Sequence, residues 1–314
     1  MFGMRPDGKR VKYLNGFYTI IPIVMKKRYD SMNQITIAIE LDNLDSFIKE
    51  QMEKTGIIYS YMDIIAAALI RTICLRPELN RFVVNSRIYQ REGIYYSLAV
   101  QKTLKKGAES NETTIKTKYT GEESIQEIHN IIDAKIREAK HVEAETSTDR
   151  TARILTSVPT FIMIPLVNFV LWLDKHGILP KAVLDTSPFH TTFFITDMRS
   201  IKLPTLHHHV YDFGTTGIFL STGTDEYQPS YDKEGNLIHK HIMKIAVVMD
   251  ERFCDGYYFA NSFRLFQKIL KNPSYLLSRL EPEEVPLTED EKHAKEKRIK
   301  KENKRNERNT KADK

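Results

Sequence analysis

Cysteine is scarce in this chain, which has only Cys74 and Cys254 among its 314 residues, each beside apolar neighbours. Two isolated cysteines exclude a disulfide framework and give none of the paired spacings that form zinc sites. The same scarcity is typical of proteins of the reducing cytoplasm. We therefore expect a cytoplasmic location and no metal site.

Long apolar runs are also missing. The longest mostly apolar stretch, residues 158–173, has 16 residues and contains Pro159 and Pro165, whereas a membrane-spanning helix needs about 20. The N-terminal residues carry charge but no apolar run of the kind found in signal peptides. We therefore expect a soluble protein.

An excess of one charge is missing from most of the chain. Residues 292–314 hold 11 Lys/Arg and 4 Asp/Glu, and the rest of the chain holds 36 basic and 37 acidic side chains. The net charge of +6 thus comes from a C-terminal tail rather than from a basic folded surface. No aromatic residues stand between the cations of this tail, which argues against a nucleic-acid partner.

Apolar residues make up 41% of the chain, and their spacing predicts both strands and helices. We predict strands at residues 34–41, 191–196, 217–221 and 244–249, with short strands between 81 and 101. We predict helices at residues 42–56, 61–74, 124–139 and 259–270. This mixture indicates the α/β or α+β class. We expect an irregular N-terminal segment at 1–30, a body at 31–285, and a basic tail at 286–314 that is disordered or forms a solvated helix.

Residues 154–178 form an apolar insertion in this body. We expect a buried helical hairpin there. The alternative is an exposed surface that contacts a protein partner or a membrane, to which the basic tail would add attraction for an anionic bilayer.

The most specific pattern lies in residues 244–261, KIAVVMDERFCDGYYFAN. An apolar strand leads into Asp250-Glu251-Arg252 and, after two residues, into Asp255-Gly256. This pattern resembles the D-H-R-x-x-D-G signature of dihydrolipoamide acyltransferases, the acyl-transfer components of 2-oxo acid dehydrogenase complexes. Chloramphenicol acetyltransferases have a related H-x-x-x-D-G form. Four further segments resemble the family in order and spacing: RPELN at 76–80, IREAK at 136–140, FITDM at 194–198 and KNPSYLL at 271–277.

The resemblance implies a chloramphenicol-acetyltransferase-like fold, a mixed sheet flanked by helices. It also implies a homotrimer whose active sites lie between subunits, where coenzyme A and lipoamide enter a channel from opposite sides. We find no lipoyl domain and no peripheral-subunit-binding domain in the sequence. We therefore expect a stand-alone protein rather than the core of a 2-oxo acid dehydrogenase complex.

In this family the histidine of the signature is the general base for the attacking thiol or hydroxyl, and Glu251 stands at its position. A glutamate carboxyl has an ordinary pKa of about 4.3 and a thiol one of about 8.5, so a carboxylate base needs burial to raise its pKa. Two hypotheses therefore stand for Glu251: it is a buried base, or it is a structural residue.

Other family roles carry over to Thr196 and Asp255. The family has a serine that donates to the oxyanion of the tetrahedral intermediate, and Thr196 has a hydroxyl at that position. The last aspartate of the signature orients the catalytic loop through a buried ion pair with an arginine from near the start of the domain. The resemblance thus implies that Asp255 pairs with Arg28 or Arg71, and Gly256 suits a tight turn.

Three consecutive histidines, His207, His208 and His209, lie between two of the predicted strands, in a loop that borders the channel in the family. His208 is a candidate to replace the missing base. Because successive side chains of an extended segment point in different directions, three metal ligands from one run are geometrically poor. Surface or packing roles are the alternative.

Two functions follow. The first is an acyltransferase that moves an acyl group between coenzyme A and an unknown acceptor, with Glu251 or His208 as base. The second is an inactive pseudoenzyme that binds or scaffolds as a trimer through the apolar insertion and the tail. Residues 103–118 are polar where the family has an apolar strand lining the channel, so the usual coenzyme A contacts are in question.

Overall fold

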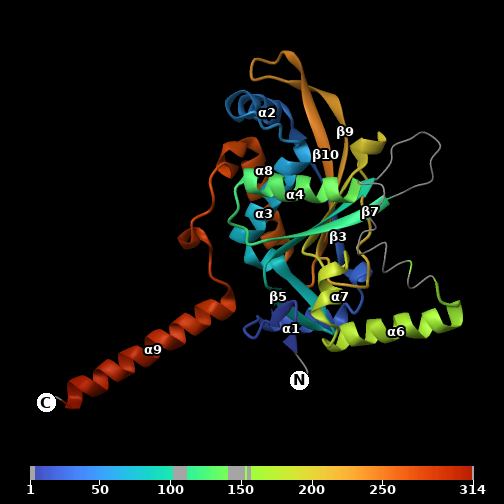
Figure 1. The fold of residues 1–314 in the computed structure, drawn as a ribbon. Helices are drawn as coiled ribbons and strands as arrows, with labels where there is room; N and C mark the ends of the chain where they lie inside the picture. Colours follow the sequence, from blue (N-terminus) through green and yellow to red (C-terminus); the bar gives the residue numbers. More distant parts are fainter. Residues whose placement is uncertain (1–3, 102–111, 141–152, 154–156, 313–314) are drawn as a thin grey trace.

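A mixed six-stranded sheet, with the strand order β3-β10-β9-β8-β6-β7, forms the centre of the molecule (Figure 1). The computed structural model describes residues 4–101, 112–140, 153 and 157–312. The strands are β3 (Met32–Glu40), β6 (Ile94–Gln101), β7 (Glu112–Tyr119), β8 (Phe193–Asp197), β9 (Ile218–Tyr231) and β10 (Leu237–Asp250). β8 runs parallel to β6 and β9, and the other pairs are antiparallel.

Helices cover one face of this sheet and enclose the main core (Figure 1). They are α2 (Asp42–Thr55), α3 (Tyr61–Leu75), α4 (Ile125–Lys140) and α8 (Gly256–Lys271). α3 begins with a capping box between Ser60 and Asp63, and its residues from Asp63 to Cys74 are buried. This all-round burial follows because α3 packs against α4, α8 and β6. The predicted α/β class, with a mixed sheet flanked by helices, is confirmed.

The N-terminal segment is more regular than predicted. β1 (Met4–Arg5) and β2 (Gly8–Arg10) join β4 (Arg81–Val84) and β5 (Arg87–Arg91) in a second sheet of order β1-β2-β5-β4. α1 (Gly16–Val24) follows, with the Asn15 side chain accepting from the Phe17 backbone N–H. The prediction of an irregular segment at residues 1–30 was therefore wrong. Strands of two or three residues show no periodicity, and these form by backbone pairing of β1 with β2 and of β2 with β5.

β9 and β10 are also longer than predicted, at 14 residues each, and form a hairpin that extends beyond the helices (Figure 1). Their outer halves are polar and largely exposed, so the backbone ladder rather than apolar burial holds them. The turn is closed by the Asp232 side chain, which accepts from the Asn236 backbone N–H at 2.7 Å. Gly235 there has a positive φ of 86°, which favours glycine.

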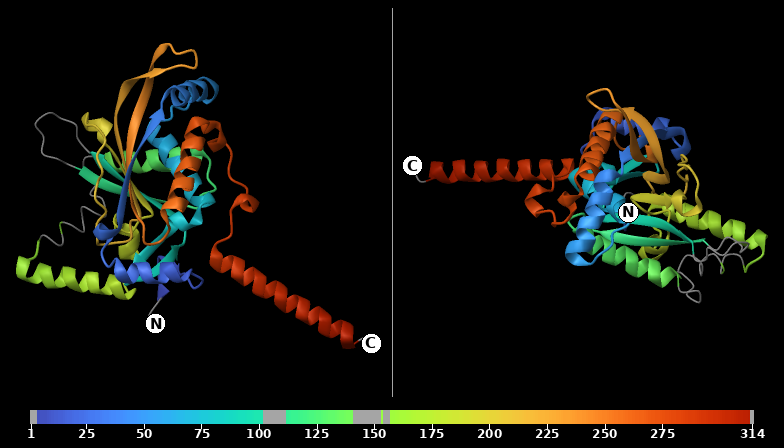
Figure 2. Two further views of the ribbon diagram at one scale, coloured as in Figure 1. Left: turned by 180° about the vertical axis from the view of Figure 1, so that it is seen from behind. Right: turned by 90° about the horizontal axis from the view of Figure 1, so that it is seen from above.

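The apolar insertion differs most from its prediction. Its described part contains α6 (Thr160–His176), and the short α7 (Lys181–Thr186) follows it. A buried helical hairpin was expected, but α6 projects from the body (Figure 2), with Phe161 75% and Trp172 50% exposed. Among the described residues, no helix combines the length and the apolar content needed to cross a membrane.

The C-terminal tail forms α9 (Glu289–Ala312), which runs away from the body (Figure 2). Of the two states predicted for this charged segment, the solvated helix is the one found. Residues 103–111 of the polar segment at 103–118 lie outside the described residues. The rest of that segment belongs to β7, an edge strand paired with β6.

Candidate functional site

The signature loop lies between the end of β10 and the start of α8. Asp250, the last residue of β10, is 1% exposed, and its carboxylate lies 2.7 Å from Arg252 Nη2 and 3.4 Å from Arg28 Nε. Ser31 Oγ donates to the same carboxylate at 3.1 Å. Burial alone would raise the pKa of Asp250, but the hydrogen bond and charge of Arg252, with the charge of Arg28, hold it below its ordinary value.

The ion pair predicted for Asp255 is therefore made by Asp250 instead. Asp255 is exposed and caps α8, accepting from the Tyr258 backbone N–H at 2.6 Å and from the Tyr18 hydroxyl at 2.9 Å. Arg28 also donates to the backbone carbonyls of Tyr211 and Gly214. Arg71 donates to backbone carbonyls near the C-terminus of the body, including that of Ser278 at 2.8 Å. The prediction assigned the buried ion pair to the wrong aspartate. Residue spacing alone does not show that Asp250, at the end of β10, lies beside Arg28.

Glu251 is half-buried and has one defined partner. Asn33 Nδ2 donates to Glu251 Oε2 at 2.6 Å, and the Glu251 backbone N–H donates to the Ser31 carbonyl at 3.0 Å. Asn33 pairs with Met249 in the β3–β10 ladder, and Met249 belongs to the core beneath the helices. Because paired residues point to the same face of a sheet, Asn33 and the Glu251 carboxylate lie on the helical side. Nothing in the sequence singled out Asn33.

Thr196 lies on the opposite face of the sheet. It alternates with Ile195, which belongs to the main core, and it shares its face with Phe194, which packs with Phe219 and Val248 in a separate small cluster. Thr196 is paired with Ser221 across β8 and β9. Its hydroxyl contacts the Met198 thioether sulfur at 3.8 Å, a weak acceptor. This hydroxyl is thus oriented away from the helices and only loosely held.

The three histidines cross this same face. His208 stacks on Phe219 with ring centroids 4.3 Å apart, and His207 Nε2 lies 3.1 Å from Thr36 Oγ1 on β3. Their loop is fixed to the sheet by Thr205, whose hydroxyl donates to the Ser221 carbonyl at 2.7 Å. A Cβ on Gly223 would lie 2.3 Å from the Thr205 backbone nitrogen, so only glycine lets the loop approach β9 this closely.

The chain thus brings Thr196 and His208 to one face of the sheet and leaves Glu251 on the other. The four predicted catalytic residues do not form one cluster within a single chain. The exposed Asp255 caps the start of α8 and directly follows Phe253 and Cys254, which are buried in the core.

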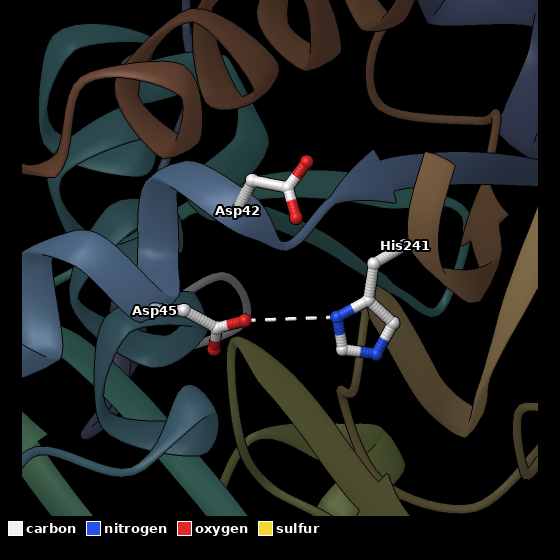
Figure 3. A group of neighbouring side chains, drawn as sticks. All are labelled: Asp42, Asp45 and His241. Atoms are coloured by element: carbon white, nitrogen blue, oxygen red, sulfur yellow. Dashed lines mark ion pairs between the residues drawn. The ribbon is translucent and has the colours of Figure 1, made fainter. Parts of the chain in front are cut away.

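A second charged group, missed in the sequence, lies at the base of the long hairpin (Figure 3). The ligand atoms of Asp42, Asp45 and His241 lie within 4.8 Å of one another. His241 Nδ1 is 3.6 Å from Asp45, and its Nε2 is 2.8 Å from Asp225 on the neighbouring strand. The aspartates are solvent-exposed, and we assign this group to holding the hairpin against the first turn of α2.

A buried network fixes the apolar insertion to the body. Asp174 at the end of α6 accepts from Arg5 at 2.8 Å, and its other oxygen lies 3.2 Å from His190 Nε2. His190 Nδ1 lies 2.8 Å from Ser187 Oγ. The order Ser-His-Asp is that of a hydrolase triad, but the Ser187 contact closes a three-residue turn and His190 is 1% exposed. The network therefore anchors α6 and α7.

This network predicts a pH dependence of stability. Burial lowers the pKa of His190, although Asp174 opposes the shift. The ring stays neutral in the folded chain at pH values where the unfolded chain becomes protonated. The free energy of unfolding should therefore fall as the pH drops below about 6.5, by up to about 1.4 kcal/mol per pH unit.

Urea unfolding between pH 7.5 and 5 measures this slope. His190→Gln should flatten it, and His239→Gln, at an exposed histidine of the hairpin, should leave it unchanged. Equal slopes in the wild type and His190→Gln would contradict the assignment.

Comparison with known proteins gives likenesses in structure alone. No protein-family model and no curated protein matches the chain. A probable dihydrolipoamide acetyltransferase from Listeria monocytogenes 4b F2365 is 13% identical with a TM-score of 0.51, covering 84% of this chain and 95% of its own. The cubic core of a pyruvate dehydrogenase multienzyme complex is 11% identical with a TM-score of 0.54. The Azotobacter vinelandii dihydrolipoamide acetyltransferase is 11% identical with a TM-score of 0.53. Each of these two alignments covers 86% of this chain and 95% of the other chain.

These likenesses cover nearly the full length of each neighbour, and they agree with the sheet and the helices described above. At such low identity they concern the fold. The chain has the chloramphenicol-acetyltransferase-like fold of dihydrolipoamide acyltransferase catalytic domains.

Proposed function

We propose that this protein is a cytoplasmic acyltransferase that takes an acyl group from a coenzyme A thioester, and that it works as a homotrimer with active sites between subunits. One observation carries the proposal. In the fold of acyltransferase cores, the signature loop from Asp250 to Gly256 is retained at the end of β10 and is held by buried ion pairs to Arg28 and Arg252. Apolar residues of similar volume often stabilise a fold as well as a buried ion pair does, so keeping these charges fits a loop whose conformation serves a function.

The opposite placement of Glu251 and Thr196 supports a site shared by two subunits. Glu251 of one subunit would take the proton from the acceptor thiol or hydroxyl. The deprotonated acceptor attacks the thioester carbonyl, and Thr196 of a neighbour donates to the oxyanion. When the tetrahedral intermediate collapses, the carbon–sulfur bond breaks and coenzyme A leaves as a thiol with the proton from Glu251.

Asn33 suits the role of a positioning residue in this scheme. A base is commonly held in orientation by a third group, and the Asn33 amide makes a 2.6 Å hydrogen bond with one carboxylate oxygen of Glu251. The other oxygen has no hydrogen bond among the described contacts. For the Azotobacter vinelandii enzyme, a serine and a histidine–asparagine pair spaced four residues apart have been studied in the catalytic mechanism. Glu251 and Asp255 have the same spacing.

The second candidate is a trimeric binding or scaffolding module without catalysis. The observation that favours it is the carboxylate at the position of the family's base. In this case changes at Glu251 or Thr196 would be silent, and changes at Phe161, Leu171 or Trp172 on α6 would abolish partner binding.

Calorimetry with coenzyme A and acetyl-coenzyme A tests the proposal, with sedimentation equilibrium on the same sample. We expect micromolar binding by a trimer, because one subunit alone does not assemble the site. Glu251→His, which restores the family's base, serves as the matched variant and should bind equally well. If neither form binds either ligand, the channel is lost and the scaffolding function replaces acyl transfer.

A further inference from the structure

Much of the surface of α6 is exposed to solvent, and the exposed side chains are mostly apolar. Met163, Val167 and Val170 are half-buried and Asp174 is buried, which marks one stripe of the helix as the side facing the body. On the rest of the circumference, Asn168 is the only polar side chain between Phe161 and Leu173. A soluble helix normally has polar residues on its outer side, so α6 is built to contact something apolar.

α1 adds to the same surface. Its Phe17, Ile20 and Ile23 are more than half exposed. In Figures 1 and 2, α1 and α6 lie at the end of the molecule opposite the β9–β10 hairpin. The two helices share the walls of one open hollow of about 660 Å³, which includes Ile23 of α1 and Leu171 of α6. We call this end the basal face, defined by Phe17, Ile20 and Ile23 of α1 and by Phe161, Phe169 and Trp172 of α6.

The hollow between the two helices is positively charged. Five cationic side chains and two acidic ones line it. Arg28 and Arg252 are committed to Asp250, and Lys27 to Asp212. Lys26 and Lys175, which are exposed, have no carboxylate within 4.0 Å among the described residues. They remain available for an anion.

The basic tail begins beside the same face. The backbone N–H groups of Lys12 and Tyr13, just before α1, donate to the Asp290 carboxylate near the start of α9. Lys297 Nζ donates to the Tyr13 hydroxyl at 2.7 Å. The cations of α9 therefore start next to the segment that leads into α1.

We propose that the basal face docks on the surface of a bilayer that contains anionic phospholipids. The apolar side chains of α1 and α6 would enter the boundary between headgroups and acyl chains, and Lys26 and Lys175 would contact headgroup phosphates. Charge complementarity selects this occupant over a second copy of the chain. Two basal faces brought together would oppose their own cations, whereas an anionic surface attracts them. The inference does not depend on acyl transfer.

The one tryptophan of the chain, Trp172, lies in the basal face and reports docking directly. The full chain is mixed with vesicles of phosphatidylcholine, with or without about one third phosphatidylglycerol, and binding is measured by flotation and by Trp172 emission. We expect binding to the anionic vesicles at least about tenfold tighter than to the neutral ones. It should come with a blue shift of the emission and quenching by brominated acyl chains.

Three variants separate the contributions. Phe161→Asp should weaken vesicle binding by about tenfold or more through its loss of apolar area. Lys26→Glu combined with Lys175→Glu should weaken binding to anionic vesicles by about 30-fold or more. Tyr231→Asp, at an aromatic of the opposite hairpin that is 72% exposed, close to the 75% of Phe161, should bind like the wild type. All four positions are exposed, so thermal unfolding should be unchanged.

Two results would overturn the proposal. In one, anionic vesicles leave Trp172 emission unmoved and the protein does not float. In the other, sedimentation equilibrium shows that Phe161→Asp breaks an oligomer while vesicle binding is absent, so that the basal face is a contact between subunits.

Discussion

Replacing Asp250 with alanine should lower the free energy of unfolding by about 3–5 kcal/mol. The carboxylate is 1% exposed and lies against two arginines, Arg28 and Arg252, that are themselves buried. Removing it leaves two guanidinium groups in the core with no charged partner, and that desolvation cost is not recovered elsewhere. Urea unfolding at neutral pH measures the loss.

Asp255→Asn is the matched control, since it changes the other aspartate of the same loop. Asp255 is exposed, and asparagine also caps helices well, so the loss should stay below about 1 kcal/mol. If the two variants were equally stable, the buried ion pairs of Asp250 would not be what holds the loop, and the observation that carries the proposed function would fail with them.

Glu251→Gln should lower the acyl-transfer rate by about 10²–10⁴-fold, the usual contribution of a general base. Glutamine keeps a side-chain oxygen that can accept from Asn33 Nδ2, so the loop should keep its conformation and its stability. The assay follows release of the coenzyme A thiol from acetyl-coenzyme A, with dihydrolipoamide as the probe acceptor. Coenzyme A affinity should be unchanged, because the carboxylate acts on the acceptor.

His208→Gln distinguishes the two candidate bases. His208 stacks on Phe219, on the sheet face that carries Thr196, whereas Glu251 of the same chain lies on the opposite face. A loss of rate in His208→Gln with a silent Glu251→Gln would assign the base to the loop histidine. If the wild type and both variants fold but none of them catalyses acyl transfer, the scaffolding function is the one that remains.

Much of the fold could be predicted because its signals are local. Alternation at residues 34–41 predicted β3, and the apolar run at 244–249 predicted the inner part of β10. The matched segments, from RPELN to KNPSYLL, fixed the order of the elements. β1, β2 and the outer halves of β9 and β10 could not be predicted, because they form by pairing with a partner strand and carry no apolar periodicity of their own.

The sequence named candidate residues for the site but could not give their geometry. It matched Glu251, Thr196 and Asp255 to motif positions of the family and offered His208 as a substitute base. It could not tell which aspartate of the signature would be buried, because the answer depends on Arg28, more than 200 residues away in the chain. Nor could it show that Asn33 bonds Glu251, since the two meet only when β3 pairs with β10.

By itself, the sequence determined the class of fold, the family likeness, the basic tail and the presence of a glutamate at position 251, because each is a matter of residue type and spacing. Only the tertiary structure decided that Glu251 and Thr196 lie on opposite faces of the sheet. It also decided that the apolar residues of α6 face solvent rather than the core. Apolar composition indicates that a segment needs an apolar environment. The packing of the rest of the chain decides whether that environment is the core of the same protein or the surface of something else.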